Sequence, residues 1–223
     1  YYSHKFQDVN IVRGTNSELL GISYPSQNIG SQIYKGVEAE LSWQQQGKRA
    51  GYRIGLNASL QNSELLYNAE ANQRYDWMRR TGQPVGMRFG YVSEGLFQSQ
   101  EEISGHATIE GYSPQPGDIK YSDLNEDGVI NQYDQTAIGD DGPAVLLGAT
   151  LALHISNFDF SALLQGQINR QVYFSGNSYW EFQNNGIGQA FENQLSRWTP
   201  ATAATATYPR LSTGIGPREG SVN

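Results

Sequence analysis

The sequence predicts an all-β fold, made of antiparallel strands of a large transmembrane β-barrel with long extracellular loops, and three observations support this. Four segments alternate apolar and polar side chains with a period of two. Each run lasts roughly 9–13 residues, whereas soluble strands average about 5–6 and tilted membrane strands need about 9–11. Short connections join strands within a pair, while residues 63–143 separate the two pairs. Short turns at one end and long loops at the other are typical of outer-membrane barrels.

The first predicted pair of strands occupies residues 33–44 and 52–62. Apolar side chains recur at every second position, at Val37, Ala39, Leu41 and Trp43 and again at Tyr52, Ile54, Leu56, Ala58 and Leu60. The positions between them carry polar or small side chains, among them Glu38, Glu40, Arg53 and Asn57. The polar stretch QQQGKRAG suits a short connection between the two strands.

The second predicted pair occupies residues 144–156 and 158–173. Its apolar positions are Val145, Leu147, Ala149, Leu151, Leu153, Ile155, Phe158, Phe160, Ala162, Leu164 and Ile168. The alternate positions include His154, Gln165, Gln167 and Asn169, which we expect to face a wet barrel interior. Only Ser156 and Asn157 separate the strands, which predicts a tight hairpin.

Aromatic residues near the strand ends predict two interfacial girdles. Trp43, Tyr52 and Phe158 fall at the turn end, and Tyr34, Tyr173 and Phe174 fall at the loop end. A further strand is expected at residues 1–12. Because the smallest closed outer-membrane barrels have about eight strands, these strands supply a partial barrel, and we expect the chain to be a fragment.

The bulk composition excludes several classes of protein. A formal net charge of -7 and a pI of about 4.9 disfavour nucleic-acid binding, because no basic surface is available for phosphates. The chain has no cysteine, so neither disulfides nor thiolate metal sites are possible. A mean hydropathy of -0.56 disfavours a helical membrane protein. The first residues, YYSHKF, lack a signal-peptide pattern, which suggests prior removal or a longer parent chain.

The stretch DLNEDGVINQYD, residues 123–134, predicts a calcium site. Its spacing matches an EF-hand loop, with ligands at Asp123, Asn125, Asp127, Val129 through its carbonyl, Asn131 through a water, and Asp134. Gly128 permits the sharp turn, and Ile130 is an apolar pin. The closing residue is Asp rather than Glu, which predicts weaker binding. The expected role of Ca²⁺ is structural, to hold a long loop with little core of its own; the alternative is an Asx-rich turn without metal.

Nothing in the sequence indicates an enzyme. His4, His106 and His154 are far apart, and no nucleophile elbow, P-loop or dinucleotide fingerprint is present. Loop aromatics are candidates for stacking on sugar rings or for packing against a partner protein. They are Tyr75, Trp77, Tyr91 and Phe97 in the long loop and Tyr179, Trp180, Phe182 and Trp198 in the last one.

Three separated motifs resemble one known family. They are NIGSQIYKGVEAELSW (28–43), GQPVGMRFGYVSEGLFQSQEEI (82–103) and PQPGDIKYSDLNEDGVINQYDQTAIG (114–139). In this order they resemble the C-terminal barrel half of SusC/RagA-type TonB-dependent transporters, which are outer-membrane proteins of Bacteroidetes. The resemblance runs from about residue 20 to about residue 200.

The resemblance implies a multi-pass barrel of about 22 strands in the bacterial outer membrane, closed by an N-terminal plug that this chain lacks. It implies residues 1–223 as part of that barrel domain, with extracellular loops at 63–143 and 174–223. It further implies TonB-driven import of oligosaccharides or peptides with a SusD-like surface lipoprotein as partner, and TonB contact through other parts of the protein. The alternatives are a soluble calcium-stabilised carbohydrate-binding β-sandwich and a secreted glycan-degrading enzyme domain.

Overall fold

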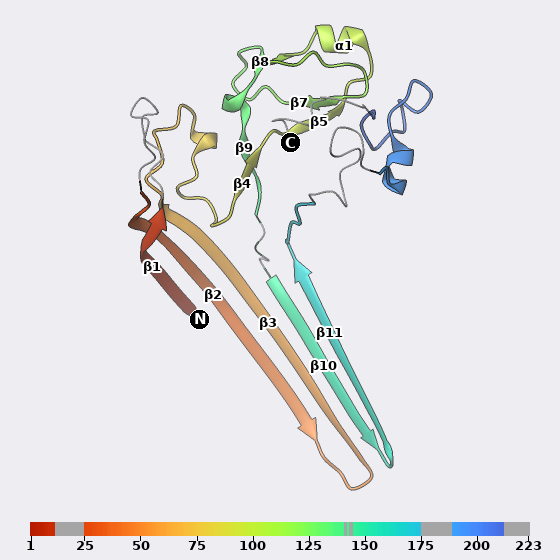
Figure 1. Cartoon of the computed structure of the whole chain (residues 1–223). Helices are drawn as coiled ribbons and strands as arrows, with labels where there is room; N and C mark the ends of the chain where they lie inside the picture. Colours follow the sequence, from red (N-terminus) through yellow and green to blue (C-terminus); the bar gives the residue numbers. More distant parts are fainter. Residues whose placement is uncertain (12–24, 141, 143–144, 175–188, 212–223) are drawn as a thin grey trace. The chain divides into compact units, whose positions relative to one another are not determined.

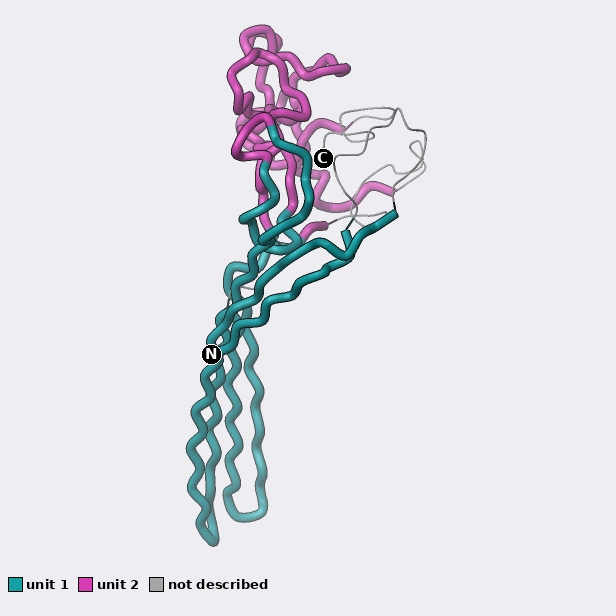
Figure 2. Tube along the Cα trace, turned by 90° about the vertical axis from the view of Figure 1, so that its left-hand side faces the viewer, with its two compact units in different colours: residues 1–73, 79–87, 140–172 teal, residues 74–78, 88–139, 173–223 magenta. Residues whose placement is uncertain are grey.

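The structure is a computed structural model that describes residues 1–11, 25–140, 142, 145–174 and 189–211. The chain divides into two compact units (Figure 2). The first comprises residues 1–73, 79–87 and 140–172, and the second comprises residues 74–78, 88–139 and 173–223. Among the described residues, no helix has the length and apolarity that crossing a membrane requires.

The first unit is a five-stranded antiparallel sheet (Figure 1). Its strands are β1 (Tyr2–Ile11), β2 (Gln27–Gln45), β3 (Ala50–Tyr67), β10 (Val145–Ile155) and β11 (Phe158–Ile168). Their order in the sheet is β1-β2-β3-β10-β11, so the long insertion between β3 and β10 returns the chain to the neighbouring position. The two predicted pairs therefore form one continuous wall.

Several strand ends differ from the predicted ranges. β2 begins at Gln27 rather than at residue 33, and β3 continues to Tyr67 rather than ending at 62. The β2–β3 ladder continues past the start of β10, as far as the Ser31–Tyr67 pair. There Lys35, Asn62 and Glu64 stand at positions in line with the apolar face, so period-two alternation fades while backbone pairing persists. β11 ends at Ile168 instead of 173, and residue 144 lies outside the described residues.

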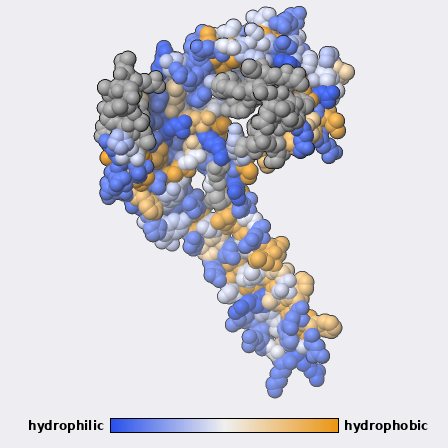
Figure 3. Space-filling view, viewed as in Figure 1, coloured by the Kyte–Doolittle hydropathy of each residue, from blue (hydrophilic) through white to orange (hydrophobic). Residues whose placement is uncertain are grey.

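The register places the apolar positions of four strands on one face of the sheet. Leu41 pairs with Leu56, which pairs with Ala149, which pairs with Leu164. Because side chains alternate strictly between faces, one such row fixes the side of every other residue in these ladders. Figure 3 shows the apolar side chains gathered along the strands, with hydrophilic ones at the turn end.

The opposite face is mainly polar, with Leu146 and Leu163 as exceptions, and it is closely fitted at its glycines. A Cβ atom at Gly148 would lie 2.5 Å from the amide oxygen of Asn57, and one at Gly55 would lie 2.4 Å from the hydroxyl of Thr150. These side chains fill the space that a residue larger than glycine would need. Glycine at these positions lets polar side chains of the adjacent strand lie across the sheet.

The expectation that Tyr34 belongs to an aromatic girdle at the loop end is wrong. Tyr34 pairs with Ser63 and therefore shares the polar face with Glu38, and its ring contacts Phe6 edge-on with centroids 5.7 Å apart. Tyr173 lies beyond the end of β11, where Arg88 stacks on its ring at 4.7 Å. At the turn end, Trp43, Tyr52 and Phe158 do share the apolar face.

The second unit contains small sheets and short helices. β4 (Arg88–Gly90) pairs with β9 (Thr136–Gly139), β5 (Ser93–Leu96) with β7 (Ile119–Tyr121), and β6 (Thr108–Ile109) with β8 (Val129–Ile130). Its helices are α1 (Gln100–Ser104) and the 3₁₀ turns η2 (Asp76–Met78), η3 (Gln132–Asp134) and η4 (Glu192–Ser196). α1 begins at Ser99, whose hydroxyl accepts a hydrogen bond from the N–H of Glu102.

The second unit also has a core, contrary to the expectation that the long loop has little of its own. Ile109, Tyr121 and Ile130 form a buried apolar cluster, and Phe97 of the same unit is also fully buried. Half-buried Tyr91, Ala107, Tyr112 and Ile119 pack against the cluster. The insertion is therefore a small folded body with hydrophobic stabilisation independent of any ion.

Candidate functional site

The predicted calcium loop folds through Asx turns, in which a side chain accepts a hydrogen bond from a nearby backbone N–H. The amide oxygen of Asn125 accepts from the N–H of Asp127 at 3.0 Å, and Asp127 Oδ1 accepts from the N–H of Val129 at 2.9 Å. Asp123 Oδ2 accepts from the N–H of Gly128 at 2.8 Å. These bonds curl residues 123–129 into a tight arc, and Gly128 has a φ of +82° that favours glycine.

Asp134 closes the loop from its other end. Its side chain is fully buried, and its Oδ1 accepts from the N–H of Leu124 at 3.0 Å while its Oδ2 accepts from the N–H of Asn131 at 2.9 Å. Asn131 returns this contact by capping η3, because its side chain accepts from the N–H of Tyr133. The twelfth residue thus ties the start of the loop to its end through the backbone.

One oxygen in the loop has no protein partner. Asp123 Oδ1 is buried and accepts no hydrogen bond. A buried carboxylate oxygen without a protein partner is costly, and a hard cation would satisfy it. The oxygen-only donor set of the loop also suits Ca²⁺. In the described part of the chain, however, no three His, Asp or Glu side chains already converge on one point. The residue types therefore fit a calcium ion, whereas in this structure their carboxylates accept hydrogen bonds from backbone N–H groups.

The apolar pin of the loop is in place. Ile130 is 2% exposed within the cluster with Ile109 and Tyr121. β8 holds it there through parallel pairing with β6, where Ile109 pairs with Ile130 and the N–H of Glu110 donates to the carbonyl of Ile130 at 3.1 Å. The loop is thereby anchored to the core at its centre.

An aromatic group adjoins the end of the loop. Trp77 Nε1 donates to the backbone carbonyl of Tyr133 at 2.9 Å, and the Trp77 ring stacks on Tyr75 at 4.5 Å with an interplanar angle of 6°. Tyr75 also meets the ring of Tyr133 edge-on at 6.2 Å. The guanidinium carbon of Arg74 lies 5.4 Å from the Tyr75 ring centroid and 5.0 Å from that of Tyr133. Tyr75 and Trp77 were candidates from the sequence for ligand contact, and in the structure their rings stack on each other.

The other loop aromatics have different environments. Phe97 is buried and meets His106 edge-on, and Tyr91 packs on Tyr121, so neither offers an exposed stacking face. Trp198 Nε1 donates to the side chain of Gln98 at 3.1 Å. Tyr179, Trp180 and Phe182 lie outside the described residues.

A buried ion pair was not predicted from the sequence. Arg210 Nε donates to Asp118 Oδ1 at 2.6 Å, and Arg210 also donates to the Tyr112 hydroxyl at 3.2 Å. The Tyr112 hydroxyl in turn donates to Asp118 Oδ2. Burial tends to lower the pKa of Arg210, but the bonds to Asp118 outweigh it and hold this pKa above its usual range. Asp118 and Arg210 are 92 residues apart, so no local sequence pattern predicts that they pair.

The apolar face of the sheet is exposed along its length. Leu41 is 71% exposed and Trp43 is 70% exposed, and Leu56, Leu60, Phe160 and Leu164 are also exposed. In the described residues of the first unit no second sheet covers this face. A β-sandwich buries the face that this sheet leaves open in the described residues.

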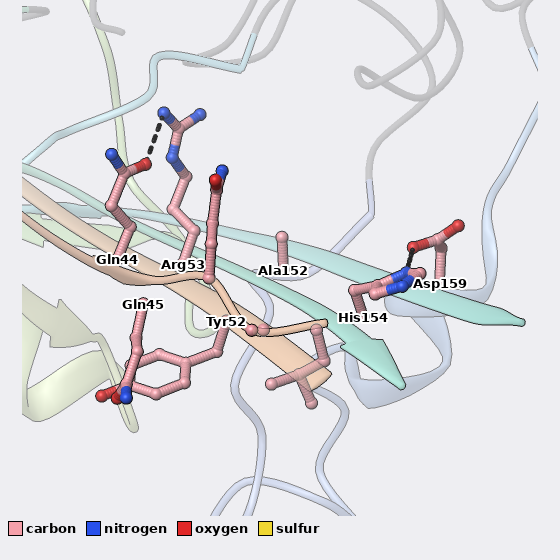
Figure 4. Close-up of a pocket in the computed structure, with 11 residues that line it drawn as sticks. Gln44, Gln45, Tyr52, Arg53, Ala152, His154 and Asp159 are labelled. Atoms are coloured by element: carbon pink, nitrogen blue, oxygen red, sulfur yellow. Dashed lines mark hydrogen bonds and ion pairs between the residues drawn. The ribbon is translucent and has the colours of Figure 1, made fainter. Parts of the chain in front are cut away.

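A shallow pocket lies at the turn end of the sheet (Figure 4). Its volume is about 470 Å³. Gln44 and Arg53 point to one side of the sheet and are joined by a hydrogen bond, while Gln45 and Tyr52 point to the other. His154 Nδ1 lies 2.7 Å from Asp159 Oδ1. His154 is on the polar face as expected.

The polar positions expected to line the barrel interior are brought together by the register. Glu40 pairs with Asn57, Asn57 with Gly148, and Gly148 with Gln165. Glu38, Arg53 and Gln167 fall on the same face. Asn169 follows the end of β11 and is outside the ladder.

Two curated proteins of Formosa agariphila are similar in sequence. TonB-dependent receptor P3 is 24% identical over 219 residues, which is 92% of this chain and 21% of that protein. TonB-dependent receptor P26 is 33% identical over 132 residues, which is 58% of this chain and 13% of that protein. The chain therefore spans about a fifth or less of the length of these relatives. No family model matches the chain.

Solved structures of a peptide transporter share the fold. The RagAB peptide transporter superposes with a TM-score of 0.60 at 15% identity, over 96% of this chain and 24% of the matched chain. The RagAB importer in its closed-closed state gives a TM-score of 0.62 at the same identity and coverage. At this identity the likeness establishes the fold alone.

The sheet with one apolar face and long loops at one end defines part of the wall of a large transmembrane β-barrel, so the predicted fold class is confirmed. The resemblance to SusC/RagA-type TonB-dependent transporters is confirmed as well, since the curated relatives are TonB-dependent receptors and the RagAB transporter shares the fold. The relatives and neighbours are receptors and transporters by name, not enzymes.

Proposed function

We propose that this chain is part of the barrel of a TonB-dependent importer in the bacterial outer membrane. The observation that carries the proposal is the register of β2, β3, β10 and β11, which sorts apolar and polar residues onto opposite faces. An exposed apolar face of this extent is stable in lipid and unstable in water. The polar face then lines the interior, and the second unit forms a folded extracellular loop.

The cargo is an oligosaccharide or a peptide, and a SusD-like surface lipoprotein is the partner. The similarity to the RagAB peptide importer favours peptide cargo. TonB acts through other parts of the parent protein. Cells that carry the intact gene, its deletion, or the deletion with the gene restored would be offered fluorescent oligopeptides and fluorescent oligosaccharides. We expect uptake of one class to depend on the gene.

Membrane extraction tests the location first. The intact protein should remain in the membrane pellet after washes with high salt and with alkaline carbonate, and should be released by detergent. Release by carbonate alone would contradict the proposal. A glycan-degrading activity of the purified protein would favour the enzyme alternative instead.

We also propose that residues 123–134 bind a structural calcium ion. The unpartnered buried oxygen of Asp123 and the oxygen-only donor set support this. The proposed ligands are Asp123, Asn125, Asp127, Val129, Asn131 and Asp134. Since Asp134 already accepts backbone hydrogen bonds through both oxygens, we expect it to contribute less to the ion than Asp123 and Asp127.

Calorimetry on the intact protein tests the calcium proposal. Asp127→Ala should abolish calcium binding. Glu126→Gln should retain it, because this substitution also removes one negative charge but Glu126 is an exposed neighbour and not a proposed ligand. Absence of binding at millimolar calcium in the unmodified protein would overturn the proposal.

A further inference from the structure

We propose that calcium binding to the loop of residues 123–134 stabilises the contacts of residues 74–78 with that loop, and that Tyr133 couples the two. The inference rests on the calcium proposal above and extends it to a second segment. Residues 74–78 belong to the second unit, whereas the residues immediately before and after them belong to the first. The chain therefore joins the second unit over only five residues, and their contacts keep this segment in that unit.

The contacts of residues 74–78 concentrate on one residue of the loop. Trp77 donates to the carbonyl of Tyr133, and the rings of Tyr75 and Tyr133 meet edge-on. Arg74 lies against the faces of both tyrosine rings. We call Arg74, Tyr75, Trp77 and Tyr133 the aromatic clasp. Three different kinds of contact thus depend on the position of Tyr133.

Tyr133 is in turn placed by the proposed ligands. It stands between Gln132 and Asp134 in η3, and the side chain of the ligand Asn131 accepts a hydrogen bond from its N–H. Asp134 fixes the turn from the other side by accepting from the N–H of Leu124 and of Asn131. A cation held mainly by Asp123 and Asp127 would hold the loop to which η3 belongs, and so steady the carbonyl and ring of Tyr133 that the clasp uses.

The clasp and the ion are linked in both directions. If calcium stabilises the docked segment by some factor, docking must strengthen calcium binding by the same factor. Couplings of this type are commonly worth about 5–150-fold. Weakening the clasp should consequently weaken calcium binding, although no clasp residue other than Tyr133 lies within the loop.

Limited trypsin digestion of the intact protein, followed by mass spectrometry, tests the coupling, because Arg74 is itself a cleavage site in the segment. We expect cleavage after Arg74 to be about tenfold slower with calcium than with a chelator. Trp77→Phe keeps an aromatic ring but removes the indole N–H. It should reduce the protection severalfold and weaken calcium binding, measured by calorimetry, by a similar factor.

Controls separate the two proposals. Trp43→Phe changes a tryptophan of the sheet and should alter neither quantity. Tyr75→Leu, which removes the stacked ring, is a second variant should Trp77→Phe fail to fold. Calcium binding with unchanged cleavage after Arg74 would overturn the coupling and leave the calcium site standing. Absence of calcium binding in the unmodified protein would overturn the site itself.

Discussion

Arg210 and Asp118 form an ion pair of 2.6 Å although 92 residues separate them in sequence. The Asp118 side chain is 5% exposed and that of Arg210 is 21% exposed, so the pair is largely shielded from water. Arg210 belongs to a stretch that also places Trp198 against Gly117, and the N–H of Arg210 donates to the carbonyl of Gly117. The pair therefore fastens the last described segment to residues 112–118.

Arg210→Gln is expected to loosen this attachment strongly. Removing one partner of a buried pair leaves the other charge without compensation, which commonly costs about 3–5 kcal/mol. Hydrogen exchange of residues 197–210 in the intact protein would measure the change in local opening free energy. Lys120→Gln is the matched control, since its pair with Glu102 is more exposed and should contribute at most about 1 kcal/mol. Equal effects of the two changes would contradict this account.

Gly117→Ala should displace Trp198. The residue has a φ of +92°, and a Cβ atom there would lie 2.6 Å from Trp198 Cε3. Gly111→Ala isolates the backbone contribution, because Gly111 has a φ of +74° and nothing lies within 4 Å of the added atom. We expect both variants to lose about 1–2 kcal/mol from backbone strain. Only Gly117→Ala should also expose the hydrogen bond from the Trp198 N–H to Tyr208, measured by hydrogen exchange.

Acid should weaken the start of α1. The hydrogen bond from the N–H of Gln98 and the contact with Lys120 hold the pKa of Glu102 below its usual 4.5. A depressed folded-state pKa stabilises the fold above the unfolded value and loses this contribution as the pH falls through the folded value. Glu102→Gln should therefore destabilise residues 98–105 near neutral pH and make little difference well below pH 4.5. Chemical denaturation at several pH values, followed by a probe on α1, would measure this. A difference that persisted in acid would show that charge is not the cause.

A positive charge on the apolar face should block assembly in the membrane. Leu56→Arg places a guanidinium where we propose lipid, at a cost of about 2–4 kcal/mol near the bilayer midplane. Asn57→Arg, one residue along the same strand, faces the other side of the sheet and should be tolerated. The amount of folded protein in isolated outer membranes is the measurement. Equal loss for both variants would argue against lipid on the apolar face.

The strands that carry apolar alternation were predictable from sequence, and the reason is physical. Leu41, Leu56, Ala149 and Leu164 belong to one row because a two-sided environment imposes a period of two, which local sequence records directly. From Asn28 to Gln32 only Ile29 is apolar, so the same backbone pairing leaves little trace in the pattern. The extended end of β2 was missed for this reason.

The loop was predictable in part. Spacing identified the turn residues and Ile130 as the apolar pin, because these depend on contacts within a short segment. The pairing of Asp118 with Arg210, and the contacts of Trp77 with Tyr133, depend on how distant segments pack. The placement of Asp134 oxygens on backbone N–H groups was also missed, because the same residue type at that position serves either an ion or the backbone.

The central claim is that the apolar face of the sheet contacts lipid while the polar face contacts water. Spin labels attached to Leu41→Cys and Glu40→Cys, in the intact protein reconstituted into bilayers, test it directly. Leu41 lies on the apolar face and Glu40 on the polar one. We predict that the label at position 41 collides readily with oxygen and poorly with a water-soluble nickel complex, and that the label at position 40 shows the reverse. Equal access of the nickel complex to both labels would contradict the claim.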